Sequence, residues 1–135
     1  MTYINAYLNF NGKCREAMNF YKDCFGGNLV MQKVSESPMA AQMPSEMGSK
    51  ILHSSLTKDG IVLMGSDMLG NAIVDGNKIG LCMNCSNLEE IHEFFNKLSA
   101  GGKIRQPLHQ SFWGATYGEL TDKFGINWMF NYSKN

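Results

Sequence analysis

The sequence predicts an α+β fold in which two tandem βαβββ modules form a cupped mixed sheet. Two observations carry this prediction: an internal repeat, and the same order of extended and helical periodicity in each half of the chain. The 135 residues correspond in length to one domain. We therefore expect a single domain over residues 1–135, with module one at about 1–67 and module two at about 77–132.

The internal repeat has an offset of about 75 residues early in the chain and about 65 residues later. The glycine pair Gly26-Gly27 aligns with Gly101-Gly102. Each match alone is weak, but the matches follow the same order along both halves. The further aligned pairs are Ile4 with Ile79, Asn9 with Asn84, Asn11 with Ser86, Thr57 with Thr121, and Met64 with Met129.

Module one begins with alternating residues 4–10, which predict a strand, and continues with helical apolar spacing over residues 13–25. Asn11 is expected to cap this helix. Gly26 and Gly27 are expected to end it, because glycine accepts the left-handed backbone that often follows a helix. Three further strands are predicted over residues 28–36, 50–58 and 61–67.

Module two repeats this order, with a first strand over residues 79–85. Ser86 or Asn87 is expected to cap the following helix, with Glu90 in the position of a capping box. The buried stripe of that helix is predicted to be Ile91, Phe94, Phe95 and Leu98. The later strands are predicted over residues 103–109, 115–121 and 126–132.

A βαβββ unit covers one face of its sheet with its own helix and leaves the other face open. Two such units side by side bury part of the open faces and enclose a cup. A hollow with an apolar floor and a few polar groups is the usual form of a small-molecule site. The repeat therefore predicts a ligand site in the cup between the modules.

Composition and charge exclude several classes of protein. Lys and Arg number 12, as do Asp and Glu, so the chain lacks the cationic surplus with which proteins bind nucleic acid. The longest aliphatic run, residues 61–64, is far shorter than the ~18 residues of a membrane span. No basic residue precedes Lys13, so no signal segment is expected. We expect a cytoplasmic protein that binds neither nucleic acid nor membrane.

Several segments along nearly the whole chain carry a family resemblance. They are Leu8-Asn9-Phe10-Asn11-Gly12, residues 16–21, Ile51-Leu52-His53, Met64-Gly65-Ser66-Asp67, residues 100–104, Phe112-Trp113-Gly114 and residues 121–128. They resemble the PhnB-like branch of the vicinal-oxygen-chelate superfamily, which holds glyoxalase I, extradiol dioxygenases and bleomycin-resistance proteins. The resemblance implies a glyoxalase-like fold and a homodimer, since members commonly pair.

The PhnB-like branch often carries the label 3-demethylubiquinone-9 3-methyltransferase-like. The chain, however, lacks the glycine-rich strand-to-helix turn followed by an acidic residue that usually binds an adenosyl cofactor. Enzymes of the superfamily instead hold a divalent metal ion through His and carboxylate side chains on the first and last strands of the modules. The repeat places the equivalent positions near Asn5, Met64, Gly80 and Met129.

These four residue types make a poor metal site, because divalent ions of this kind prefer imidazole and oxygen ligands. We therefore expect no metal and no cofactor. Cys82 and Cys85 form a C-x-x-C pattern, which leaves a metal or redox role open beside the alternative of idle thiols. Alternation predicts that the two cysteines point to opposite faces of a strand.

The catalytic residues are unknown from the sequence, with His53 and Asp67 as candidates. Alternation along residues 52–57 puts His53 on the face toward the cup, where an imidazole suits proton transfer or anion binding. Its alternative is a structural, hydrogen-bonded histidine. Asp67 ends a strand, so its alternative is the capping of a turn.

The ligand is expected to meet an apolar floor, a few polar groups and one aromatic wall, supplied by Trp113 on its loop. Residues 37–49 carry Met39, Met43 and Met47 at a spacing of four, which predicts either a flexible cover or simple packing. The expected ligand-binding residues are Tyr7, Asn9, His53, Ser55, Met64, Asn84, Trp113 and Met129.

Three functions remain open at this point. The first is a PhnB-like protein that binds a small molecule in the cup without the usual catalytic metal. The second is an enzyme of the superfamily, a lyase, dioxygenase or methyltransferase-like protein, that uses His53 and Asp67 or an unrecognised metal site. The third is a structural or protein-interaction module. The poor metal ligands favour the first, and make metal-dependent glyoxalase or dioxygenase activity the weaker expectation.

Overall fold

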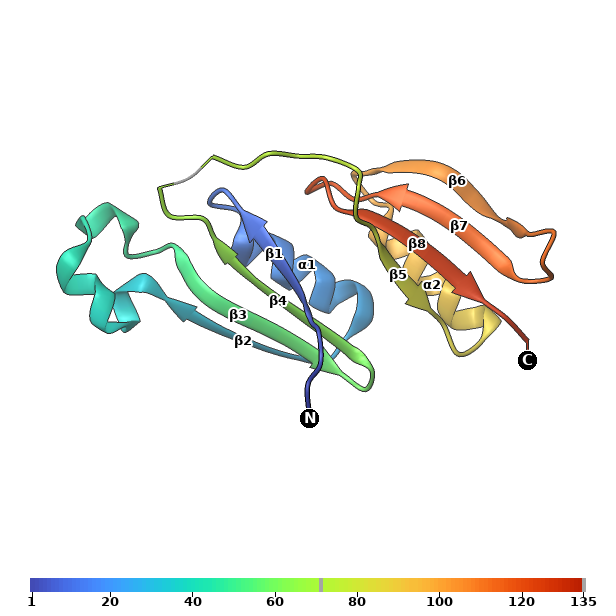
Figure 1. Ribbon diagram of the computed structural model, residues 1–135, viewed down its shortest axis with the longest axis horizontal. Coiled ribbons are helices and arrows are strands. Elements are labelled where there is room, and N and C mark those ends of the chain that lie inside the picture. The colour runs from blue at the N-terminus through green and yellow to red at the C-terminus, as the bar shows by residue number, and fades with distance from the viewer. Residues whose placement is uncertain (71, 135) are drawn as a thin grey trace. The chain divides into compact units, whose positions relative to one another are not determined.

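The computed structural model describes residues 1–70 and 72–134. The chain divides into two compact units, Met1–Val74 and Asp75–Asn135. Each unit holds one βαβββ module, whose elements are labelled in Figure 1. Each module forms a mixed four-stranded sheet, so the predicted fold class is confirmed.

Module one has the sheet order β1-β4-β3-β2, in which β1 and β4 are parallel and the other pairs are antiparallel. Its elements are β1 (Ala6–Phe10), α1 (Cys14–Phe25), β2 (Asn28–Lys33), β3 (Ile51–Lys58) and β4 (Ile61–Asp67). Between β2 and β3 lie the short 3-10 helices η1 (Val34–Glu36), η2 (Pro38–Gln42) and η3 (Ser45–Met47). The methionine-rich segment is therefore partly 3-10 helical.

Module two has the corresponding order β5-β8-β7-β6, again with the first and last strands parallel. Its elements are β5 (Leu81–Asn84), α2 (Leu88–Leu98), β6 (Lys103–Gln110), β7 (Thr116–Thr121) and β8 (Asn127–Tyr132). The two sheets thus repeat one topology, which confirms the interpretation of the internal repeat.

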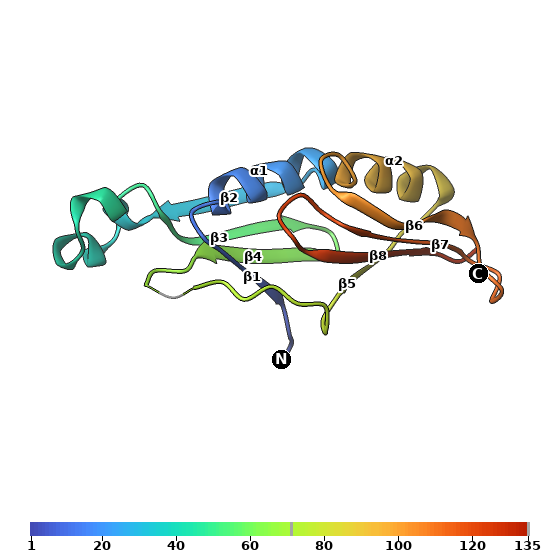
Figure 2. The ribbon, with the colours of Figure 1, turned by 90° about the horizontal axis from the view of Figure 1, so that it is seen from above.

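Each helix covers one face of the sheet in its own module, as Figure 2 shows. In module one, Met18, Tyr21 and Phe25 of α1 are buried, as are Leu56 and Leu63 of the sheet. Because strand residues alternate between faces, the side chains between these buried positions lie on the face away from α1.

Module two buries the predicted stripe of α2, Ile91, Phe94, Phe95 and Leu98. Phe95 packs edge-to-face on Phe130 of β8, with ring centroids 5.4 Å apart. Gly118 of β7 leaves room for this contact, because a Cβ at that position would lie 2.9 Å from Cε2 of Phe95. The opposite face of the sheet carries the polar residues of β7 and β8.

The helix caps agree with the sequence in module two but not in module one. Asn87 caps α2, since its side chain accepts a hydrogen bond of 2.8 Å from the Glu90 backbone N–H. The expected cap Asn11 is wrong, because α1 begins after Lys13 without a side-chain cap. The Cys14 N–H instead donates to Asp67, a residue distant in sequence that no local pattern could reveal.

Three strand ends also differ from the predictions. β1 begins at Ala6 and β5 at Leu81, later than expected, and Ile4 and Ile79 are exposed. β2 ends at Lys33 rather than at residue 36, because the pairing register with β3 shifts between Gln32 and Lys33 and the chain turns into η1.

Candidate small-molecule site

The open face of module one gathers five of the predicted ligand-binding residues. Strand pairing places Tyr7 beside Met64 and Met64 beside Ser55. Asn9 of β1 and His53 of β3 share this face by alternation and are both exposed. These five side chains therefore lie on the face of the sheet away from α1, and their role in binding remains a prediction.

Tyr7 and His53 of this group lie within contact distance of each other. The Tyr7 hydroxyl is 3.5 Å from Nδ1 of His53, and the ring centroids are 6.0 Å apart. A phenol beside an imidazole can exchange a proton or share a ligand atom. This is the arrangement in module one best suited to acid–base chemistry.

Asp67 does not lie with Tyr7 and His53 on the open face. Its side chain is buried, and its two oxygens accept the backbone N–H groups of Cys14 at 3.0 Å and Ile51 at 2.9 Å. Both acceptors of the carboxylate are thus occupied by the backbone at the start of α1 and of β3. This engagement favours a structural role for Asp67 over the catalytic one that we considered.

The open face of module two holds two cross-strand rows of side chains. One row runs from Cys82 through Met129 and Glu119 to Gln106. The other row runs from Asn84 through Asn131 and Tyr117 to His109. The predicted residues Asn84 and Met129 therefore lie in neighbouring rows of one surface.

A hollow of about 400 Å³ opens at the β6 and β7 end of these rows. It combines aromatic rings with amide, imidazole, hydroxyl and carboxylate groups, which is the composition of a small-molecule site. The lining residues are Gln106, His109, Gln110, Ser111, Phe112, Trp113, Tyr117 and Glu119. Trp113, predicted as the aromatic wall, is among them.

The aromatic wall of the hollow consists of three rings. Trp113 meets Phe112 and Tyr117 edge-to-face, with centroids 4.9 Å and 5.2 Å apart. The Phe112 side chain is 98 % exposed and that of Trp113 is 52 % exposed. Large rings with this exposure, next to a hollow, offer apolar area for a ligand to cover.

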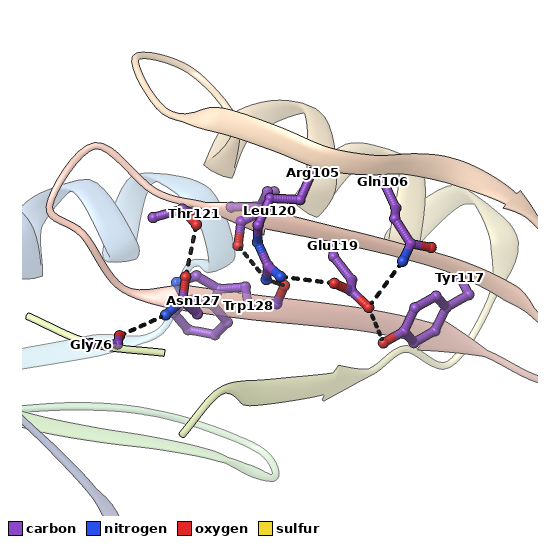
Figure 3. A network of polar contacts seen from close by, with 9 residues as sticks. All are labelled: Gly76, Arg105, Gln106, Tyr117, Glu119, Leu120, Thr121, Asn127 and Trp128. Atoms are coloured by element: carbon purple, nitrogen blue, oxygen red, sulfur yellow. Dashed lines mark hydrogen bonds and ion pairs between the residues drawn. The ribbon is translucent and has the colours of Figure 1, made fainter. Parts of the chain in front are cut away.

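Glu119 is the centre of the polar network in the hollow, which Figure 3 shows. Its Oε1 accepts Nη1 of Arg105 at 2.8 Å, and its Oε2 accepts the Tyr117 hydroxyl at 2.9 Å and the Gln106 amide at 3.4 Å. Nη2 of Arg105 also donates to the carbonyl oxygens of Leu120 and Trp128, each at 3.3 Å. These hydrogen bonds hold the Glu119 carboxylate in one position in the lining of the hollow.

The network also changes the acidity of Tyr117. Burial, reinforced by the hydrogen bond to Glu119 and by its charge, raises the pKa of Tyr117 to about 12. Tyr117 is therefore a neutral phenol at physiological pH, with its hydrogen committed to Glu119.

The four side chains of this network, Arg105, Gln106, Tyr117 and Glu119, are absent from the ligand-binding residues expected from the sequence. A signal existed for Glu119, since the offset of 64 that aligns Thr57 with Thr121 also aligns Ser55 with Glu119. No such signal existed for Arg105, because a shift of register between Ile104 and Gln106 places it out of the regular alternation.

The metal positions of the superfamily do not fit a metal ion in this chain. Among them, the Asn5 amide nitrogen lies 3.9 Å from the Met64 sulfur, and an amide and a thioether are poor ligands for hard or borderline divalent ions. In residues 1–70 and 72–134, no three His, Cys, Asp or Glu side chains gather closely enough to hold an ion.

The C-x-x-C cysteines have the character of idle thiols. Cys82 is exposed on the open face, whereas Cys85 follows β5 and is partly buried. Burial raises the pKa of both, and that of Cys85, which Glu90 and Cys82 raise further, reaches about 12. Thiols with raised pKa values are poor nucleophiles and metal ligands at neutral pH.

No helix within the described parts of the chain has the length and apolar character needed to cross a membrane.

Comparison with known proteins identifies a family. The family model described as 3-demethylubiquinone-9 3-methyltransferase matches residues 2–130. Protein YjdN of Escherichia coli K12 is 32% identical over 140 aligned positions, which cover 97% of this chain and 95% of YjdN. These matches extend over nearly the full length of the chain, as the seven sequence segments do.

Solved structures show the same relationship. Protein PA1353 from Pseudomonas aeruginosa is 34% identical, with a TM-score of 0.89 over 100% of both chains. A putative 3-demethylubiquinone-9 3-methyltransferase, PhnB protein, from Bacillus cereus is 27% identical, with a TM-score of 0.78 over 98% of this chain and 100% of that one. A glyoxalase/bleomycin resistance protein/dioxygenase family enzyme from Burkholderia phytofirmans, 14% identical with a TM-score of 0.62 over 94% and 96% of the chains, shares the fold alone.

Proposed function

Because this chain belongs to the 3-demethylubiquinone-9 3-methyltransferase family, in the PhnB-like branch of the glyoxalase superfamily, we propose that it binds a small organic molecule without a catalytic metal. The hollow of module two is the primary site of contact. The open face of module one, with Tyr7 and His53, is a separate candidate surface.

The hollow is the observation that carries this proposal. Its volume of about 400 Å³ suits a small ligand, and its wall of Phe112, Trp113 and Tyr117 supplies apolar area beside the fixed carboxylate of Glu119. The donor set at the superfamily's metal positions, an amide, a Gly and two thioethers, supports binding rather than metal-dependent turnover. The lack of an adenosyl-binding turn argues against methyl transfer despite the family's description.

A second candidate function is acid–base catalysis on a bound ligand by His53. The 3.5 Å approach of the Tyr7 hydroxyl to His53 favours it, since a phenol can orient an imidazole or relay its proton. Asp67 does not provide a second acid–base group, because its carboxylate is buried and accepts backbone N–H groups.

We also propose a cytoplasmic homodimer, from the sequence and from the pairing that is common in the superfamily.

The test is a fragment screen by ligand-detected NMR on three forms of the protein: wild type, Trp113→Ala and Leu88→Ala. Leu88 is a matched control, since its side chain is 49% exposed, similar to Trp113, and lies on α2 outside the hollow. Fragments should bind wild type and Leu88→Ala, and lose affinity by about 1 kcal/mol or more in Trp113→Ala, the scale of an aromatic contact. Absence of hits, or hits indifferent to Trp113→Ala, would contradict the proposal.

A further inference from the structure

The hollow of module two carries a single formal charge on its lining. Glu119 supplies it, and no Lys or Arg is found among the lining residues that the structure describes. Arg105, outside the lining, pairs with Oε1 of Glu119 and with two backbone carbonyls, whereas Oε2 lies with Gln106 and Tyr117 of the lining. An anionic ligand would therefore find no cation to pair with inside the hollow.

The hydrogen bond of His109 to the backbone determines which of its ring nitrogens carries the hydrogen. Nδ1 lies 2.8 Å from the carbonyl oxygen of Pro107. A carbonyl only accepts, so Nδ1 carries the hydrogen, and in the neutral ring Nε2 is then an acceptor. His109 thus offers the hollow a lone pair.

Gln106 and Tyr117 offer lone pairs for the same reason. Each donates one hydrogen to Oε2 of Glu119, Gln106 from its amide nitrogen and Tyr117 from its hydroxyl. The amide oxygen of Gln106 and the phenolic oxygen of Tyr117 keep acceptor capacity. The raised pKa of Tyr117 agrees with a phenol that holds its proton.

The four side chains form one continuous acceptor surface. Register pairs Gln106 with Glu119 and His109 with Tyr117 on adjacent strands β6 and β7. The lining also holds donors: the second hydrogen of the Gln106 amide, the Gln110 amide, the Ser111 hydroxyl and the Trp113 indole N–H. Ser111 already accepts the Ala115 N–H at 3.1 Å, which holds it toward the loop.

We propose that this hollow selects a cation, an alkylammonium group joined to a flat aromatic ring. The inference rests on the proposed function and names the class of its ligand. The ammonium donates to the acceptor surface of Gln106, His109, Tyr117 and Glu119, as charge-assisted hydrogen bonds require. The aromatic body covers Phe112 and Trp113, whose ring faces also attract positive charge.

The test uses three probes that share one ring system and differ in charge. They are 1-naphthylmethylamine, a cation at pH 7, 1-naphthalenemethanol, which is neutral, and 1-naphthylacetate, an anion. Affinities are measured by isothermal titration calorimetry at low ionic strength. The amine should bind about tenfold or more tightly than the alcohol, the effect of one charge-assisted hydrogen bond, and the acetate should bind most weakly.

Two variants then locate the selectivity. Glu119→Gln removes the charge and leaves Arg105 without its partner, so the order of amine and acetate should reverse. Because Glu119 also bonds Arg105 and Gln106 of the neighbouring strand, Gln110→Lys provides a second test on an exposed residue of the lining. It should weaken the amine and strengthen the acetate, whereas the uncharged Gln110→Met should leave the order unchanged.

The outcomes separate this inference from the proposed function. Probes that bind equally, or an acetate that binds most tightly, overturn the ligand class while a loss of affinity in Trp113→Ala still supports the site. An amine that binds tightly but is indifferent to Glu119→Gln and Gln110→Lys places the cation elsewhere and also overturns the inference. If only other screened fragments bind in the hollow, the proposed function stands and the ligand class is wrong.

Discussion

The indole N–H of Trp128 donates to Oδ2 of Asp122 at 2.9 Å, and both side chains are buried. Oδ1 of Asp122 accepts the backbone N–H groups of Phe124 at 2.8 Å and Ile126 at 3.1 Å. One carboxylate therefore closes the turn between β7 and β8 and fixes the largest side chain in the core of module two. The open face that carries Glu119 depends on these same two strands.

Asp122→Ala is expected to lower the free energy of unfolding by about 2–4 kcal/mol, because it strands a buried indole N–H and two turn amides. Urea denaturation followed by Trp fluorescence measures the change. Asp23→Ala is the control, since Asp23 is exposed on α1 and its loss should change stability by less than about 0.5 kcal/mol. Equal stability of the two variants would refute this account of the turn.

Gly118→Ala tests the close packing between β7 and α2. The added Cβ would lie 2.9 Å from Leu108 Cδ2 and from Phe95 Cε2, and 3.2 Å from the Gln106 carbonyl oxygen. Overpacking of this kind typically costs about 1–3 kcal/mol, and here it should also displace Gln106 at the hollow. Gly60→Ala serves as control, because nothing lies within 4 Å of its added Cβ. In thermal unfolding, Gly118→Ala should melt at a clearly lower temperature than Gly60→Ala.

The sequence predicted the topology well because periodicity is a property of each element alone. The stripe of α2, the Asn87 cap and the alternation that exposes His53 all follow from spacing of a few residues. The prediction of an Asn11 cap failed because the Cys14 N–H at the start of α1 donates to Asp67 instead. Asp67 lies 53 positions after Cys14 in the chain. Long-range backbone contacts of this kind leave no local pattern.

The candidate site was predictable to the extent that it lies on regular strands. Tyr7, Ser55 and Met64 share a face because the strands that carry them alternate regularly. Arg105 lies at a shift of register, where alternation stops being a guide. Trp113 was found through residue type, whereas the hollow beside it depends on how a loop folds back on Tyr117.

Metal addition should leave the protein's stability unchanged. A ligand that binds only the folded state must raise the melting temperature, and the superfamily positions Asn5, Met64, Gly80 and Met129 offer no imidazole or carboxylate. We expect no shift with one equivalent of Ni²⁺ or Zn²⁺ in differential scanning fluorimetry. A rise of several degrees that His53→Ala abolishes would show that His53 is a metal ligand.

Homodimer formation is expected in solution. Exposed apolar side chains lie on and near the first strands of the modules, including Ile4 at 96%, Tyr7 at 46% and Ile79 at 81% exposure, and apolar surface of this kind commonly marks an interaction site. Light scattering at micromolar concentration should give twice the chain mass. A mass near the 15.1 kDa of one chain would contradict this expectation.

The ionisation of Tyr117 reports directly on the network at the hollow. Its pKa is raised from 10.0 to about 12 by burial and by Glu119, so the folded protein holds this proton more tightly than the unfolded chain does. The stabilisation of the fold by this protonated phenol is therefore complete below about pH 10 and is lost as the pH rises through 12.

A difference titration of wild type against Tyr117→Phe, by phenolate absorbance, isolates this one residue from the other tyrosines. In Glu119→Gln the pKa should fall toward its ordinary value, because the acceptor charge is gone. A Tyr117 that titrates near pH 10 in the wild type would mean that its hydroxyl is not bound to Glu119, and the acceptor surface of the hollow would lose one of its four members.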